Sequence, residues 1–249
     1  PPVARRLAQE LVVRDKVDIL AGFALTPNAI AAAAGSQEAN KLMVVMNAAP
    51  SIIITKSPSM IRTSMTLPQV GYNFGKWAGS KGGIKECYTM VTDYGPGHDV
   101  ERSFAPGFKE AGGKIIGSVR FPIRSPDFAA FVQRAKDLKP ECVMIFVPGG
   151  TQPAAIAKAM AERGLDPKSV KILGSGELTS EQALKSMGKT GIGIISGWHY
   201  DYSDKSRPMN VDFVKAYNAE FGRNPDFFSV GGYDGMHAIY EALKKTNGS

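Results

Sequence analysis

The side chains that most often do chemistry in enzymes form no recognised catalytic pattern in this 249-residue chain. The three histidines, His98, His199 and His237, lack the regular spacing of metal ligands. The chain has no GxSxG turn to expose a nucleophilic serine and no GxxxxGK[ST] loop to hold a nucleotide phosphate. The turns at residues 95–97 and 174–176 contain glycines but do not complete a GxGxxG motif. The sequence therefore predicts a binding site without metal or cofactor rather than a reaction centre.

The segments that follow the predicted strands consist of small residues, hydroxyls and a few aromatics. They are residues 23–26, 47–51, 93–97, 148–151, 175–179 and 198–200. In open α/β sheets, ligands bind beyond the carboxyl ends of the strands. Backbone N–H groups at a helix start attract a carboxylate, which the helix dipole also stabilises. The rings of Phe23, Tyr94, Trp198 and Tyr200 can form apolar walls, so these segments are suited to binding a small molecule.

Several of these positions also have a purely structural interpretation. Thr26, Thr151 and Thr179 are N-cap candidates first, although a capping residue can still contact a ligand. Trp198 can pack in a core or a hinge as well as line a pocket. Glu177 can cap or pair locally, or it can accept a hydrogen bond from a ligand. The sequence leaves these alternatives open.

Short apolar runs alternate with amphipathic stretches of helix length. We expect strands at residues 17–21, 42–46, 88–92, 114–119, 143–147, 170–173 and 193–196. These runs are rich in β-branched residues and do not alternate with polar ones, as is typical of parallel strands covered on both faces. A polar segment at 201–208 precedes a further helix at about 209–221. The pattern predicts an α/β fold with doubly wound parallel sheets, and it fits one sheet or two lobes equally well.

The predicted helices carry start and stop signals. Thr26 precedes Pro27, which places a hydroxyl at the N-cap and a proline at the first helical position. Residues 125–127 repeat this arrangement with a first-turn acid, and residues 179–182 fit a capping box. The glycines at 112, 113 and 164 predict helix ends.

Composition excludes several classes of function. The net charge is +7, but the basic residues are scattered, whereas binding to nucleic acid requires a basic patch or stripe. No run of 18 apolar residues is present, so no membrane span is predicted. Cys87 and Cys142 lie near the starts of apolar runs and are expected to be small buried side chains, with a disulfide as an open alternative.

The sequence resembles the branched-chain-amino-acid type of periplasmic binding protein over nearly all of its length. The stretch 15–22 followed by Thr26 is similar to the family's DKV-x-x-x-x-G … S/T signature. Further matches, in family order, are residues 47–49, 61–63, 93–97, 107–108, 112–113, 126–128, 174 and 232–234. No single motif is specific, but their order and spacing together favour the family.

The resemblance implies a type I fold: two Rossmann-like lobes joined by three strands, with the ligand between them. Lobe one would comprise residues 1–64 and 203–249, and lobe two residues 65–202. The resemblance also implies that this sequence is an interior part of a longer chain, without the first strand and helix of family members.

Binding positions can be carried over from the family to this sequence. In lobe one they are Leu25 and Thr26, with Phe23 beside them, and Asn47, Ala48, Ala49 and Ser51, where family members bind the ligand carboxylate. In lobe two they are Tyr94, Gly149, Gly150 and Glu177, and Trp198 is added from its place after the last predicted strand. Glu177 matches the acid that receives the ammonium group in amino-acid binders. Pro50 stands where relatives often have a hydroxyl residue, which weakens the amino-acid interpretation.

The resemblance implies a periplasmic receptor that delivers a ligand to the membrane permease of an ABC transporter, and we expect it to be a monomer. The stretch 47–63 is closer to the aromatic-acid branch, which favours a benzoate- or hydroxycinnamate-like ligand. A branched-chain or other apolar amino acid is the alternative. A ligand-sensing regulator domain and an α/β enzyme are the alternatives of other classes.

Overall fold

The computed structural model describes residues 1–124 and 126–248. The chain divides into two compact units, one of residues 1–66 and 204–249 and the other of residues 67–203. It passes between them after Thr66 and after Ser203, and neither crossing is a strand, unlike the three connecting strands implied by the resemblance. Across the described residues, no helix is both long and apolar enough to span a membrane.

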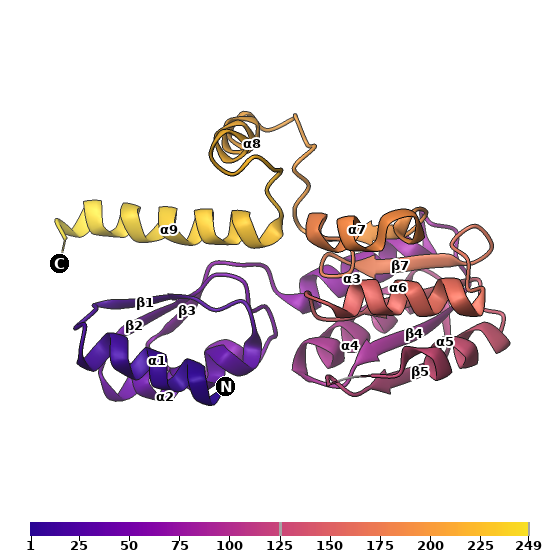
Figure 1. Cartoon of the computed structure of the whole chain (residues 1–249), viewed down its shortest axis with the longest axis horizontal. Helices are drawn as coiled ribbons and strands as arrows, with labels where there is room; N and C mark the ends of the chain where they lie inside the picture. Colours follow the sequence, from indigo (N-terminus) through magenta and orange to yellow (C-terminus); the bar gives the residue numbers. More distant parts are fainter. Residues whose placement is uncertain (125, 249) are drawn as a thin grey trace. The chain divides into compact units, whose positions relative to one another are not determined.

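The first unit is a parallel sheet with helices on both faces (Figure 1). Its described elements are α1 Pro2–Val13, β1 Ile19–Gly22, α2 Thr26–Glu38, β2 Leu42–Val45, the short 3-10 helix η1 Ile53–Thr55, β3 Met60–Arg62, α8 Pro208–Phe221 and α9 Phe227–Thr246. The strand order is β1-β2-β3, and the core beneath α1 and α2 contains Leu20, Met43, Val45 and Ile53. The strand β3 was not predicted from the sequence.

The helix α9 packs on the end of β2 through two glycines one turn apart. A Cβ on Gly231 would lie 2.6 Å from the Met46 carbonyl oxygen and would also meet the Asn47 side chain. A Cβ on Gly235 would lie 2.8 Å from the Met46 methyl carbon. Glycine at these positions therefore sets how closely α9 approaches the residues that follow β2.

The second unit is a larger parallel sheet in the order β5-β4-β6-β7-β8 within the described residues. Its elements are α3 Leu67–Gly79, β4 Glu86–Thr92, α4 Gly95–Glu110, β5 Lys114–Phe121, α5 Phe128–Asp137, β6 Cys142–Phe146, α6 Gln152–Arg163, β7 Lys171–Ser175, α7 Glu181–Met187, the 3-10 helix η2 Gly188–Gly191 and β8 Ile195–Gly197. The α/β class with parallel sheets is confirmed.

Two helical layers cover this second sheet. The chain moves outward through α4 to β5 and then back through α5 to β6, so right-handed crossovers place α4 and α5 on opposite faces. One face packs under α5, α6 and α7, with Met90, Ile145 and Ile156 in its core. The other face packs under α3 and α4, which contact each other extensively.

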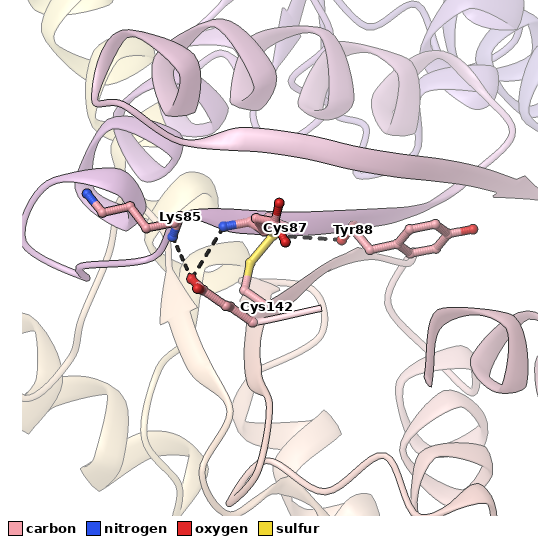
Figure 2. The surroundings of a disulfide bond; sticks show 6 residues. Lys85, Cys87, Tyr88 and Cys142 are labelled. Carbon is pink, nitrogen blue, oxygen red and sulfur yellow. Dashed lines mark hydrogen bonds between the residues drawn. A yellow bond between two sulfur atoms is a disulfide. The ribbon is translucent and has the colours of Figure 1, made fainter. Parts of the chain in front are cut away.

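Cys87 and Cys142 form a disulfide between the neighbouring strands β4 and β6 (Figure 2). The two residues are direct partners in the parallel register, with Cα atoms 4.5 Å apart, and neither side chain is exposed to solvent. Their predicted burial is confirmed. The disulfide, which the sequence left as an alternative, is present in the structure. Beside them, a Glu141 carboxylate oxygen accepts the backbone N–H of Lys85 at 2.7 Å.

The prediction that Thr26 is the N-cap of α2 is wrong by one residue. The helix α2 begins at Thr26, and Leu25 is its N-cap. Thr26 is therefore the first residue of the helix, and it is only 6% exposed.

The predicted capping box at 179–182 is likewise displaced. Ser180 is the N-cap of α7 and accepts the N–H of Ala183 at 3.3 Å. Thr179 instead donates its hydroxyl to the Ser175 carbonyl at 3.1 Å. Thr151 does occupy the N-cap of α6, but its side chain makes no capping hydrogen bond.

The other helix start and stop signals predicted from the sequence agree with the structure to differing degrees. The helix α5 is capped by Asp127, which accepts the N–H of Ala129 at 3.0 Å, and the predicted cap Ser125 lies outside the described residues. Gly164 ends α6 in the left-handed conformation, as predicted. Gly112, at φ +86°, follows the end of α4 and reverses the chain toward β5.

Replacing Gly231 with alanine should destabilise the first unit by about 1–3 kcal/mol, because the methyl group must displace backbone atoms at the end of β2. Hydrogen exchange at the backbone amides of Val44 and Val45, which lie in β2, measures this loss of stability. Gly232→Ala is the matched control, because a Cβ there meets nothing within 4 Å and helix propensity should leave the unit equally or more stable. Equal protection in both variants would refute the close packing.

Reduction of the Cys87–Cys142 disulfide should lower the unfolding free energy of the second unit by about 4 kcal/mol, because a loop of 55 residues is released in the unfolded chain. Urea unfolding followed by the fluorescence of Trp77 and Trp198, both in this unit, measures the change. In the Cys87→Ala/Cys142→Ala variant, a reductant should have no effect. A wild-type midpoint that does not respond to reductant would contradict the cross-link.

Candidate functional site

The candidate site in the second unit lies at the carboxyl ends of parallel strands. Tyr94 follows β4, Gly149 and Gly150 follow β6, Glu177 follows β7 and Trp198 follows β8. Because β4, β6, β7 and β8 are neighbours in the sheet, the segments after them meet at one edge. The sequence thus located one contiguous set of residues through the strand ends.

Glu177 is the central ionisable group of this edge. The residue is half-buried, but its Oε2 oxygen is buried without a hydrogen-bond partner among the described residues. Burial raises the pKa of Glu177 to about 8, and its own backbone and the nearby Ser175 hydroxyl oppose this effect. The carboxyl group is therefore mostly protonated near neutral pH, and it can both donate and accept a hydrogen bond.

Tyr94 and Glu177 are electrostatically coupled. Burial, and secondarily the charge of Glu177, raise the pKa of Tyr94, so its phenol stays neutral. The Tyr94 ring lies 6.3 Å from the ring of Phe146, the last residue of β6. Tyr94 also stands at the N-cap of α4, which fixes its backbone beside the helix start.

Trp198 is placed by a glycine that the sequence analysis did not single out for this role. Its indole lies against Gly176, where an added Cβ would come within 2.5 Å of the indole Cδ2 atom. The hydroxyls of Thr179 and Ser196 are 2.5 Å apart next to this arrangement. Glycine one residue before the buried acid is the signal that could have indicated a ring stacked on the backbone.

In the first unit, the segment after β1 combines backbone strain with a helix start. Phe23 has φ +67°, in the left-handed region that non-glycine residues rarely adopt. Its ring is half-buried and packs on the core of this unit. Leu25 is 48% exposed, whereas Thr26 is buried at the start of α2. Leu25 therefore offers a large exposed apolar side chain in this segment.

The segment after β2 is held by the surrounding fold. The Asn47 side-chain amide donates to the Phe228 carbonyl at 3.3 Å, which ties it to the start of α9. Ala48 and Ala49 are buried, so their side chains contribute to packing. Ser51 is exposed on the following turn. Of these four predicted residues, Ser51 has the side chain most open to solvent.

The histidines form no common site. His98 lies in the first turn of α4, and its ring is 2.6 Å from a carboxylate oxygen of Asp93. Within residues 1–124 and 126–248, no group of three or more His, Cys, Asp or Glu side chains is arranged to hold a metal ion.

Comparison with solved structures identifies the class of fold. A solute-binding protein of an ABC transporter from Rhodopseudomonas palustris BisB5, in complex with 3,4-dihydroxybenzoic acid, is 44% identical with a TM-score of 0.91. Another from R. palustris, in complex with 4-hydroxybenzoate, is 38% identical with a TM-score of 0.93. Each comparison covers 100% of this chain and 68% of the other. The fold is that of a type I periplasmic binding protein.

Sequence comparison identifies the family. The model of the family described as periplasmic binding protein matches residues 1–249, and the chain belongs to this family. A relative named Leu/Ile/Val-binding protein homolog 6, from Brucella melitensis, is 40% identical over 251 aligned residues. The alignment includes 100% of this chain and 64% of the relative, so the chain spans about two thirds of that relative's length. The predicted family is thereby confirmed.

The buried Glu177 should make the stability of the second unit depend on pH. Its pKa rises from 4.5 to about 8 on folding, so its stabilising contribution is full below pH 4.5 and is lost as the pH rises to 8. The unfolding free energy should therefore fall by a few kcal/mol across this window. In Glu177→Gln, which cannot ionise, that part of the pH dependence should disappear in urea unfolding. An unchanged profile would show that the carboxyl group ionises normally.

Proposed function

We propose that this chain is the ligand-binding core of a periplasmic solute-binding receptor that serves the membrane permease of an ABC transporter. Membership of the periplasmic binding protein family supports this function. The two structural relatives named above are solute-binding proteins of ABC transporters. The Cys87–Cys142 disulfide supports an oxidising location such as the periplasm, because such bonds rarely persist in the cytosol.

The ligand that we propose is a small aromatic carboxylate with a ring hydroxyl. The observation that carries this choice is the buried, mostly protonated carboxyl group of Glu177 beside Tyr94. A neutral carboxyl group can exchange hydrogen bonds with a phenolic hydroxyl without burying a charge. The structural relatives that carry 3,4-dihydroxybenzoic acid and 4-hydroxybenzoate support the same ligand class.

The roles of the two units follow from the groups that they present. In the second unit, Glu177 and Tyr94 meet the ring hydroxyl, Trp198 packs on the ring, and Gly149 and Gly150 offer backbone groups. In the first unit, the start of α2 near Thr26 and the segment from Asn47 to Ser51 receive the carboxylate, because a helix start favours negative charge. Phe23 and Leu25 provide apolar contacts beside it.

The two compact units are the two lobes of the receptor in this proposal. The ligand contacts both lobes and favours a closed state, which the permease then recognises. The receptor acts as a monomer, binds no nucleic acid and does not transform its ligand. Small-angle scattering should record compaction on addition of saturating ligand, and unchanged dimensions would contradict the closure.

A branched-chain or other apolar amino acid is the second candidate ligand. The relative named Leu/Ile/Val-binding protein homolog 6 favours it. In that case Glu177 must ionise to receive the ammonium group, and burying both charges is costly unless they pair closely. The raised pKa of Glu177, which results from its burial, is what favours the aromatic acid.

Calorimetry with 4-hydroxybenzoate and with leucine distinguishes the two ligands. We expect 4-hydroxybenzoate to bind, and Glu177→Gln to weaken it by only about tenfold, because glutamine still offers a neutral donor and acceptor. If only leucine binds, and Glu177→Gln weakens that binding by at least about 100-fold, the ligand is instead an amino acid. Glu162→Gln, exposed on α6, is the control and should alter neither affinity.

A further inference from the structure

A second tyrosine of the same sheet has a buried hydroxyl that the proposed function does not use. Tyr88, on β4, is 1% exposed, and its hydroxyl has no hydrogen-bond partner within the part of the chain described. The side chain points away from the neighbouring disulfide (Figure 2). Its ring fits over Gly117 of β5, where an added Cβ would lie 2.8 Å from Tyr88 Cε2. Burying an unpartnered hydroxyl is unfavourable, so this group calls for an explanation.

Tyr88 lines a groove of about 750 Å³ between β5 and one face of α5. The groove is lined on the strand side by Gly117 and Ser118, and on the helix side by Gln133 and Arg134. Arg163, the last residue of α6, also borders it. All of these residues belong to the second unit, so this groove is independent of how the two units are placed.

Two acids and two arginines border the groove, so its formal charges balance, but Arg134 has no hydrogen-bond or ion-pair partner among the described residues. Its two acids are engaged, because Asp127 caps α5 and Asp137 accepts the side-chain amide of Gln133 at 2.8 Å. Burial raises the pKa of Tyr88, and the nearby charge of Arg134 opposes this effect. The guanidinium group of Arg134 is thus close enough to act on the phenol.

We propose that this groove is a second ligand site, which binds the oxyanion of a small molecule with an apolar body. Arg134 pairs with the carboxylate or phosphate group, and the Tyr88 hydroxyl donates to it. Ile116 and Leu138 contact the apolar part. This site is separate from the candidate site that contains Tyr94 and Glu177. Tyr88 lies six residues before Tyr94 along the strand direction, which corresponds to a separation of about 20 Å at 3.3 Å per residue.

Amide NMR of the whole chain, titrated with phenyl phosphate and separately with benzoate, tests this site. We expect saturable shifts at Gly117, Ser118 and Ala130 with at least one probe, and the probe that binds identifies phosphate or carboxylate. Arg134→Gln should weaken this binding by at least about tenfold, and Tyr88→Phe by about tenfold. Arg102→Gln, which removes the same charge from α4 on the opposite face, should leave it unchanged.

The outcomes separate this site from the proposed function. Shifts around Tyr94 and Glu177 alone, with none at the groove for either probe, would overturn the second site and leave the first intact. Equal weakening in Arg134→Gln and Arg102→Gln would also overturn it, because it would show only general charge attraction. Tyr88→Phe should keep or raise the melting temperature, because the lost hydroxyl has no partner, and a lower one would assign Tyr88 a structural role instead.

Discussion

Parallel pairing of the strands is the constraint on which the candidate site depends. Every strand pairing among the described residues is parallel, so the carboxyl ends of neighbouring strands meet at one edge. This brings Tyr94 and Glu177 together although 83 residues separate them in sequence. The amino ends form the opposite edge, where Cys142 begins β6 and is bonded to Cys87. The covalent link therefore stabilises the sheet away from the groups that can meet a ligand.

Close approach through glycine completes the positioning in both units. Gly176 lets the Trp198 indole lie against the backbone, and Gly231 lets α9 reach the Asn47 side chain. In each case the missing Cβ sets the separation of two elements, so a rigid contact holds the predicted site residue. Asn47 is then satisfied by the Phe228 carbonyl, and its main effect is to orient the segment that follows β2.

The sequence predicted the strands well because buried parallel strands are short, continuous apolar runs. It missed β3, whose three residues are too few to show a pattern and which exists through its pairing with β2. It placed the cap of α2 one residue late, because the helix already begins at Thr26, which is buried as its first residue. The bond between Cys87 and Cys142 depends on the register of β4 against β6, which no local pattern contains.

The positions of the candidate residues could be predicted from the strand ends, but their chemical states could not. An acid at residue 177 is visible in the sequence, whereas its protonation follows from the burial that the fold imposes. That state bears directly on the proposed ligand. An ammonium group only donates hydrogen bonds and carries a charge that a neutral carboxyl group cannot balance, whereas a phenolic hydroxyl both donates and accepts. In the proposed function, burial of Glu177 thus turns an acid of the amino-acid-binding pattern into a neutral partner for a ring hydroxyl.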